Sequence, residues 1–223
     1  GIASPTDRDD AWLRNLTGQD DAWLTGPRSA DWWTGPNPQA GPCPGVGPDG
    51  VITGLPLPDL ATCTRDQVLA YFDNGWAITE LLFSSLQGEE AFFRPPYHGL
   101  RHPLIFYYGH PAAVYINKLR VAGLLDAPVD AFLETVMETG VDVMSWDDMS
   151  KNEMRWPGVR QVHEYRRQVY AIVRQLIETH ADFAPGHGPV TPDDATWAIV
   201  MCFEHERIHI ETTSVLMREL PLH

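Results

Sequence analysis

The chain has 223 residues, of which 43% are hydrophobic and 10% aromatic, a composition typical of a globular protein. Its net charge is -14 and its isoelectric point is near 4.9, so it should repel nucleic acid phosphates and anionic lipid surfaces. We therefore expect neither nucleic acid nor a membrane among its partners. No apolar run approaches the length of a membrane span, and the first residues lack the basic and apolar parts of a signal peptide. The three cysteines have no CxxC spacing, which favours a reducing cytoplasm as the location.

Residues 1–62 are rich in Pro, Gly, Asp and Trp, and the segment Asp9–Leu13 recurs as Asp20–Leu24. This density of Pro and Gly blocks long helices and central strands. Four tryptophans within residues 12–33 are untypical of a disordered tail. We expect an irregular N-terminal arm at 1–62 whose tryptophans dock on the main domain or on another one; a mobile tail is the alternative.

Residues 63–223 are predicted to form an all-α domain. Apolar residues recur at helical spacing in four long segments, at about 64–88, 102–125, 159–180 and 191–219. Thr64 and Gln67 have the capping-box pattern at the start of the first segment, and Thr191 and Pro192 predict the start of the fourth. The link at 126–158 is long and is expected to hold a short helix at 129–138. These features predict an antiparallel four-helix bundle with a long crossover between helices 2 and 3.

Two histidines near the C-terminus have the spacing of metal ligands. His205 and His209 lie four residues apart in a predicted helix, so both face the same side and can bind one metal ion. With Glu206 they match the HExxH pattern of zinc metalloproteases. The downstream sequence argues against a protease, because one such class takes its third ligand from a later helix and only 14 residues follow His209. The other class needs Gly where Thr212 stands.

The third ligand is therefore expected upstream, and His110 is the best candidate because it lies on an otherwise apolar face of the second helix. A hydrogen-bonded core histidine is the alternative interpretation. The other histidines are expected at the surface, in links or at helix ends: His98, His102, His163, His180 and His187. Three imidazoles leave coordination positions open, which is typical of a catalytic site. Their spacing does not choose among Zn, Fe(II), Ni and Cu.

Several stretches resemble the N-terminal DinB-like domain of the 5-histidylcysteine sulfoxide synthases of ovothiol biosynthesis, and more distantly the ergothioneine-pathway enzymes. The resemblance covers nearly the whole chain and is carried by Trp32–Pro36, Gly88–Phe92, Leu100–His110, Gly140–Asp148 and Phe203–His209. It implies a mononuclear non-haem Fe(II) held by His110, His205 and His209. It also implies an oxidoreductase that joins the sulfur of L-cysteine to the imidazole carbon of L-histidine, using O2, and yields a sulfoxide.

The resemblance also implies a partner. In that family a formylglycine-generating-enzyme-like domain follows the bundle and supplies a catalytic tyrosine and substrate contacts. We therefore expect this chain to be a fragment or a split-gene product, and to need such a domain in cis or in trans. Ile208 stands where the ergothioneine-pathway enzymes often have Gln, which favours the histidine and cysteine branch.

Other roles stay open at this point. Tyr107 can face the iron pocket or the core, and Arg101 and Arg155 can bind a substrate carboxylate or form ordinary salt bridges. The acidic link from 142 to 155 is either a loop beside the pocket or a solvated turn. Glu206 and Glu211 are expected to orient the histidines rather than act as a catalytic base. Two other functions fit the same pattern: a DinB-like thiol transferase that uses Zn or Ni, and a non-catalytic interaction module.

Overall fold

The computed structural model describes residues 44–45, 47–48, 51–86, 88–138 and 155–221. Four long helices dominate this part of the chain: α3 (Arg65–Ser84), α5 (Leu104–Val121), α8 (Val159–Thr179) and α9 (Trp197–Met217). Three short ones join them: α4 (Glu90–Phe93), α6 (Ala131–Val136) and the 3-10 helix η4 (Ala181–Phe183). The predicted all-α bundle is confirmed. None of the described helices combines the length and the apolar character that crossing a lipid bilayer requires.

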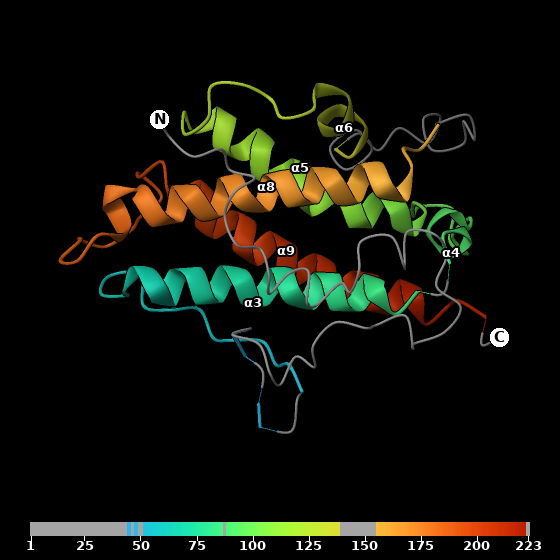
Figure 1. The fold of residues 1–223 in the computed structure, drawn as a ribbon, viewed down its shortest axis with the longest axis horizontal. Coiled ribbons are helices and arrows are strands. Elements are labelled where there is room, and N and C mark those ends of the chain that lie inside the picture. The colour runs from blue at the N-terminus through green and yellow to red at the C-terminus, as the bar shows by residue number, and fades with distance from the viewer. Residues whose placement is uncertain (1–43, 46, 49–50, 87, 139–154, 222–223) are drawn as a thin grey trace.

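The four long helices lie side by side and run in two directions (Figure 1). Helices α3 and α9 run one way, and α5 and α8 run the other way. Because α5 and α8 are neighbours that run in the same direction, the chain must return along the whole bundle between them. This is the predicted crossover between the second and third long helices, and it carries α6. Its residues 139–154, including most of the acidic link, lie outside the described residues.

The helix boundaries follow local hydrogen bonding. The capping box of α3 is confirmed: Thr64 Oγ1 accepts from the Gln67 N–H, and Gln67 Oε1 accepts from the Thr64 N–H. The predicted start of the fourth helix at Thr191 is wrong, because α9 begins at Trp197. Before Trp197 the main chain forms separate i→i+3 turns, in which the Asp194 N–H donates to the Thr191 carbonyl at 2.9 Å and the Trp197 N–H donates to the Asp194 carbonyl at 3.1 Å.

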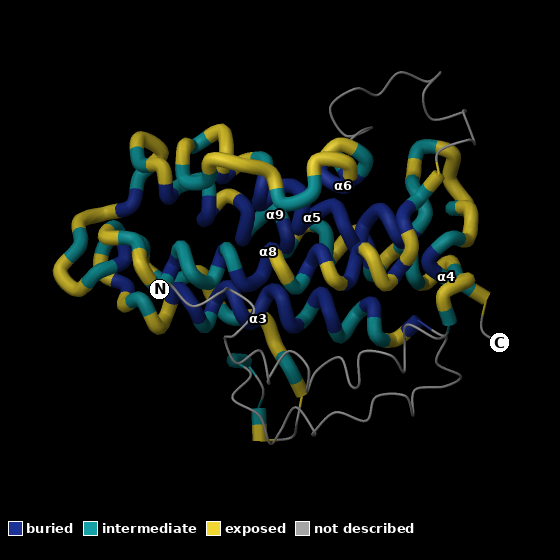
Figure 2. The backbone as a smooth tube through the Cα atoms, turned by 45° about the horizontal axis from the view of Figure 1, so that its top comes forward, coloured by how far each residue is buried: buried dark blue, intermediate teal, exposed yellow. Residues whose placement is uncertain are grey.

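Buried residues, dark blue in Figure 2, lie along the inner faces of the four long helices. Val121, the last residue of α5, is 87% exposed. One prediction about these faces is wrong. His163, expected at the surface or in a link, is buried on α8, where its Nδ1 lies 2.8 Å from the Tyr108 hydroxyl. Cys202 is buried.

The core holds a buried ion pair that joins three helices. Arg166 of α8 donates through Nε to Glu80 of α3, at 2.7 Å, and through Nη1 to the Tyr108 carbonyl of α5, at 2.9 Å. The guanidinium also lies over the Trp76 ring, 4.3 Å from its centroid. Because both charged side chains are almost fully buried, each depends on the other for its solvation.

A buried amide, that of Asn74 on α3, ties the described residues between 44 and 55 to the bundle. Asn74 Nδ2 donates to the carbonyls of Pro44 and Thr53, and its Oδ1 accepts the Leu55 N–H at 2.9 Å. Gly45 has φ +87° and packs against this amide, a conformation that favours glycine. The predicted docking of the arm's tryptophans lies outside the described residues.

Candidate metal centre

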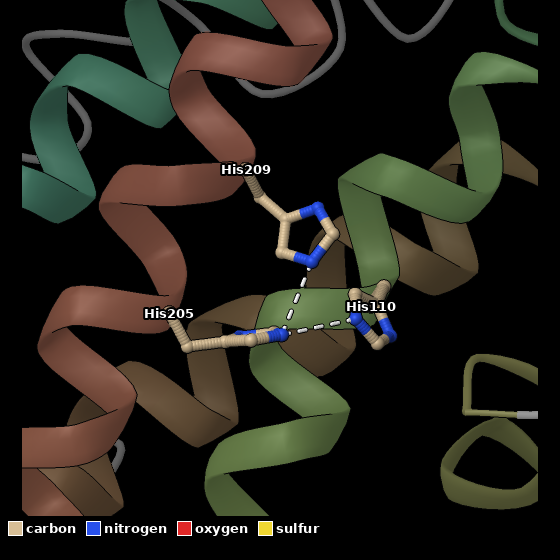
Figure 3. Close-up of side chains that lie close together, drawn as sticks. All are labelled: His110, His205 and His209. Atoms are coloured by element: carbon tan, nitrogen blue, oxygen red, sulfur yellow. Dashed lines mark hydrogen bonds between the residues drawn. The ribbon is translucent and has the colours of Figure 1, made fainter. Parts of the chain in front are cut away.

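Three histidines from two helices meet at one point of the bundle (Figure 3). His110 comes from α5, and His205 and His209 come from successive turns of α9. The His205 Nε2 atom lies 3.2 Å from His110 Nε2 and 3.1 Å from His209 Nε2. One nitrogen from each ring lies within 4.8 Å of the other two. The structure thus brings together the three residues that the sequence predicted as a ligand set.

The orientation of His110 is fixed by a main-chain carbonyl. Its Nδ1 lies 2.6 Å from the carbonyl oxygen of Met137, the residue that caps the C-terminus of α6. A carbonyl oxygen only accepts hydrogen bonds, so Nδ1 carries the proton and the neutral ring has its lone pair on Nε2. That lone pair points toward His205. His110 is therefore already in the tautomer that a metal ligand needs.

All three imidazoles are neutral near pH 7. Burial, together with repulsion from the neighbouring His209 and His205 rings and against the hydrogen bond to Met137, lowers the pKa of His110 to about 3. Burial, with repulsion from His209, lowers the pKa of His205 to about 4, and burial lowers that of His209 to about 4. Neutral imidazole is the form that binds metal ions.

The chemistry of these donors fits a metal ion. The nitrogens His205 Nδ1 and His209 Nδ1 are buried and have no hydrogen-bond partner among the described residues. A neutral histidine that ligates a metal through Nε2 carries its proton on Nδ1. Three Nε2 lone pairs that face one another repel unless a cation lies between them. A three-nitrogen set on one side leaves the other side free for substrates. His205 and His209 are both partly exposed, so the cluster is open to the outside of the bundle.

Aromatic side chains of α5 surround the cluster. Phe106 stacks on His110, with ring centroids 4.9 Å apart, and Tyr107 lies 6.2 Å from His209 in the same measure. The Tyr107 hydroxyl accepts the His102 N–H at 3.2 Å. Two positions were left open for Tyr107, beside the histidines or in the core. The structure places its ring beside the histidines, and the residue is also buried, at 7% exposed. Its hydroxyl is held by the main chain rather than aimed at the cluster.

The carboxylates next to the histidines in the sequence do not orient them. Glu206 is 1% exposed, and its Oε2 accepts from Thr79 of α3, on another side of α9. Glu211 is exposed. The Nδ1 atoms of His205 and His209 have no hydrogen-bond partner among the described residues, so neither carboxylate accepts a hydrogen bond from them. The expected orienting role of Glu206 and Glu211 is therefore wrong for this structure.

Three of the remaining candidates are exposed: Arg101, Arg155 and His98. His187 lies in its predicted loop, where it bonds to the carbonyls of Cys63 and Gly188. Residues 142–154 of the acidic link lie outside the described residues. Met137, which orients His110, is a residue that sequence reasoning missed, because a main-chain acceptor has no side-chain signature. Gly109 beside His110 was the available signal for a close approach.

The fold and the site together define a helical bundle with a three-histidine cluster suited to a metal ion. The model of the DinB superfamily matches residues 71–213, and the chain belongs to that superfamily. No curated protein matches the chain. The matched residues span all four long helices and include His110, His205 and His209.

Proposed function

We propose that this chain is the iron-binding domain of a non-haem Fe(II), O2-dependent sulfoxide synthase that joins L-cysteine to L-histidine. The observation that carries the proposal is the cluster of three neutral imidazoles, with His110 held in the ligating tautomer. The motif resemblance to the 5-histidylcysteine sulfoxide synthases supports the reaction, because the three residues implied as iron ligands are the three that meet in the fold.

In the proposed reaction one C–S bond forms between the cysteine sulfur and the histidine imidazole, and the S–H and C–H bonds are broken. One oxygen atom of O2 enters the sulfoxide, and the other leaves as water with the two hydrogens. Fe(II), if bound, would supply open coordination positions and pass electrons from the two substrates to O2. The chain's own residues hold it: three imidazoles on one side, with Phe106 and Tyr107 keeping this side of the cluster apolar.

The proposal includes a second protein surface. The bundle offers His205 and His209 at a partly exposed position, which is suited to a site that another domain completes. We propose a formylglycine-generating-enzyme-like domain, in cis or in trans, as the source of the catalytic tyrosine and substrate contacts. A cytoplasmic location follows from the same assignment.

The test is iron content after anaerobic loading with Fe(II), compared between wild type, His209→Ala and His98→Ala. His98 is exposed and lies outside the cluster, so its variant controls for the loss of one imidazole. We expect stoichiometric iron in wild type and His98→Ala, and loss of it in His209→Ala. Full retention of iron in the folded His209→Ala protein refutes the assignment.

Oxygen consumption separates this function from the alternatives. A Zn- or Ni-dependent thiol transferase on the same bundle uses the cluster without O2, so it consumes no oxygen when cysteine and histidine are added. A non-catalytic interaction module needs no metal, and its melting temperature is unaffected by a chelator. Oxygen uptake that requires both amino acids and the partner domain supports the sulfoxide synthase.

A further inference from the structure

The short helix α6, within the crossover, contacts the metal centre through its C-terminal end. Met137, its C-cap residue, is fully buried, and its carbonyl oxygen is the acceptor for His110 Nδ1. The Met137 side chain packs on the α5 backbone at Gly109. A Cβ placed on Gly109 would lie 2.8 Å from the Met137 sulfur and 3.0 Å from its Cγ. Real Cβ atoms essentially never lie 2.8 Å from another heavy atom, so with any side chain at 109 the Met137 side chain would have to move from its place against α5.

A second contact holds the same two helices together. Asn117 lies two turns after His110 on α5. Its Nδ2 donates to the Glu134 carbonyl of α6 at 3.2 Å and to the Glu138 carboxylate. Helix α6 is itself well capped, because Asp130 Oδ1 accepts the Leu133 N–H at 3.0 Å. The carbonyl of Met137 is thus placed by side-chain packing at one point and by hydrogen bonds at another.

We propose that α6 is a positioning element for the metal site, in which Gly109 admits Met137 and the Met137 carbonyl sets the ligating tautomer of His110. This inference rests on the proposed metal site. Hydrogen bonds to the second nitrogen of a ligating histidine change metal affinity by about 10–100-fold when they are lost. Displacing α6 should therefore weaken metal binding without removing any ligand.

A pair of substitutions that conserves the buried volume tests this role. Gly109→Val fills the space that Met137 occupies, and Met137→Ala empties it while keeping the carbonyl. We expect Gly109→Val to weaken Co(II) binding by about 10–100-fold, and the double variant Gly109→Val, Met137→Ala to recover most of the affinity. Co(II) is the probe because its visible absorption reports the ligand geometry.

The tautomer is read independently of any metal. The 15N imidazole signals of metal-free wild type should place the His110 proton on Nδ1, and those of Gly109→Val should lose that single tautomer. Gly75→Ala is the matched control for a mid-helix glycine, because its Cβ meets nothing closer than 3.4 Å. It should keep the wild-type tautomer and affinity. If Gly109→Val does not fold, Asn117→Ala replaces it, since it loosens α6 while the Gly109 contact stays intact.

Each outcome decides between the two proposals. A folded Gly109→Val or Asn117→Ala protein with wild-type tautomer and affinity overturns the role of α6. If the wild-type protein carries the His110 proton on Nε2 and still binds Co(II), the role of α6 is overturned, but the metal site stands. A wild-type protein with the proton on Nδ1 that takes up neither Co(II) nor Fe(II) overturns the metal site itself, and the role of α6 with it.

Discussion

Replacing Glu206 with Gln should stabilise the protein in alkaline solution and leave it almost unchanged in acid. Glu206 follows His205 in the HExxH-like motif, but its side chain lies in the core, fully buried, with Thr79 as its hydrogen-bond donor. Burial raises the pKa of this carboxyl to about 7, against the attraction of Arg166 and Arg207 and the Thr79 hydrogen bond. The folded protein therefore favours the neutral carboxyl.

The magnitude follows from the two pKa values. A carboxyl with a pKa of about 7 in the fold and 4.5 in the unfolded chain is protonated in the fold and ionised in the unfolded chain between these values. The unfolded state then binds fewer protons, so stability falls as pH rises through this window. Above pH 7 the full cost is about 3 kcal/mol, at 1.36 kcal/mol for each pH unit between the two values. Gln, which is neutral at every pH, avoids this cost.

Urea unfolding at pH 5 and at pH 8 measures the effect. With a denaturant slope of about 1–3 kcal/mol/M, we expect the midpoint of Glu206→Gln at pH 8 to rise by about 1–3 M over wild type. At pH 5 the two midpoints should nearly coincide. Glu211→Gln removes an exposed carboxylate from the same helix and should change stability by less than about 0.5 kcal/mol at either pH. If Glu206→Gln is destabilised at pH 8, the carboxylate is ionised and held by the two arginines, and the reasoning is wrong.

Three further predictions concern the core, the segment before α3 and the metal centre. Glu80→Gln leaves the Arg166 charge buried without its counterion, so it should lower the free energy of unfolding by about 3–5 kcal/mol in urea, whereas the double change to Leu and Met should cost less. Gly45→Ala puts a Cβ against the Asn74 amide and 2.5 Å from the Thr53 carbonyl, so limited proteolysis should cut the segment 44–55 faster. Gly123→Ala, also at positive φ but in open space, is its control and should not change that cleavage. The metal-free protein should lose stability as pH falls from 6.5 toward 4, because the unfolded chain then binds protons that the three histidines of the cluster do not bind in the fold. At pH 5 the loss is at most about 2 kcal/mol for each histidine. A metal at 100 times its Kd should add about 2.7 kcal/mol, so a chelator should lower the melting temperature by about 5–10 °C. An equal acid response in a protein with all three histidines changed to Gln contradicts the assignment of that loss to the cluster.

Local signals were sufficient where the chain itself provides the partner. The capping box at Thr64 predicted the start of α3 because both of its hydrogen bonds lie within four residues. The same kind of signal at Thr191 gave the wrong start for α9. The Asp194 side chain does accept the Thr191 N–H, but the main chain that follows forms separate i→i+3 turns before the helix begins at Trp197. His163 was misplaced for a related reason: its partner Tyr108 is 55 residues away, and nothing near it in the sequence marks that contact.

The sequence by itself determined the all-α class, the crossover and the three candidate ligands. Helical spacing places His205 and His209 on one face of their helix whatever surrounds them. The apolar residues around His110 indicate that it lies on the face of its helix that packs toward the core. Only the tertiary structure decided how these residues act. It placed three neutral imidazoles nitrogen to nitrogen, turned Glu206 into the core, and brought the Met137 carbonyl from the crossover to His110. These facts depend on contacts between distant segments and on burial, which set pKa and tautomer and leave no pattern along the chain.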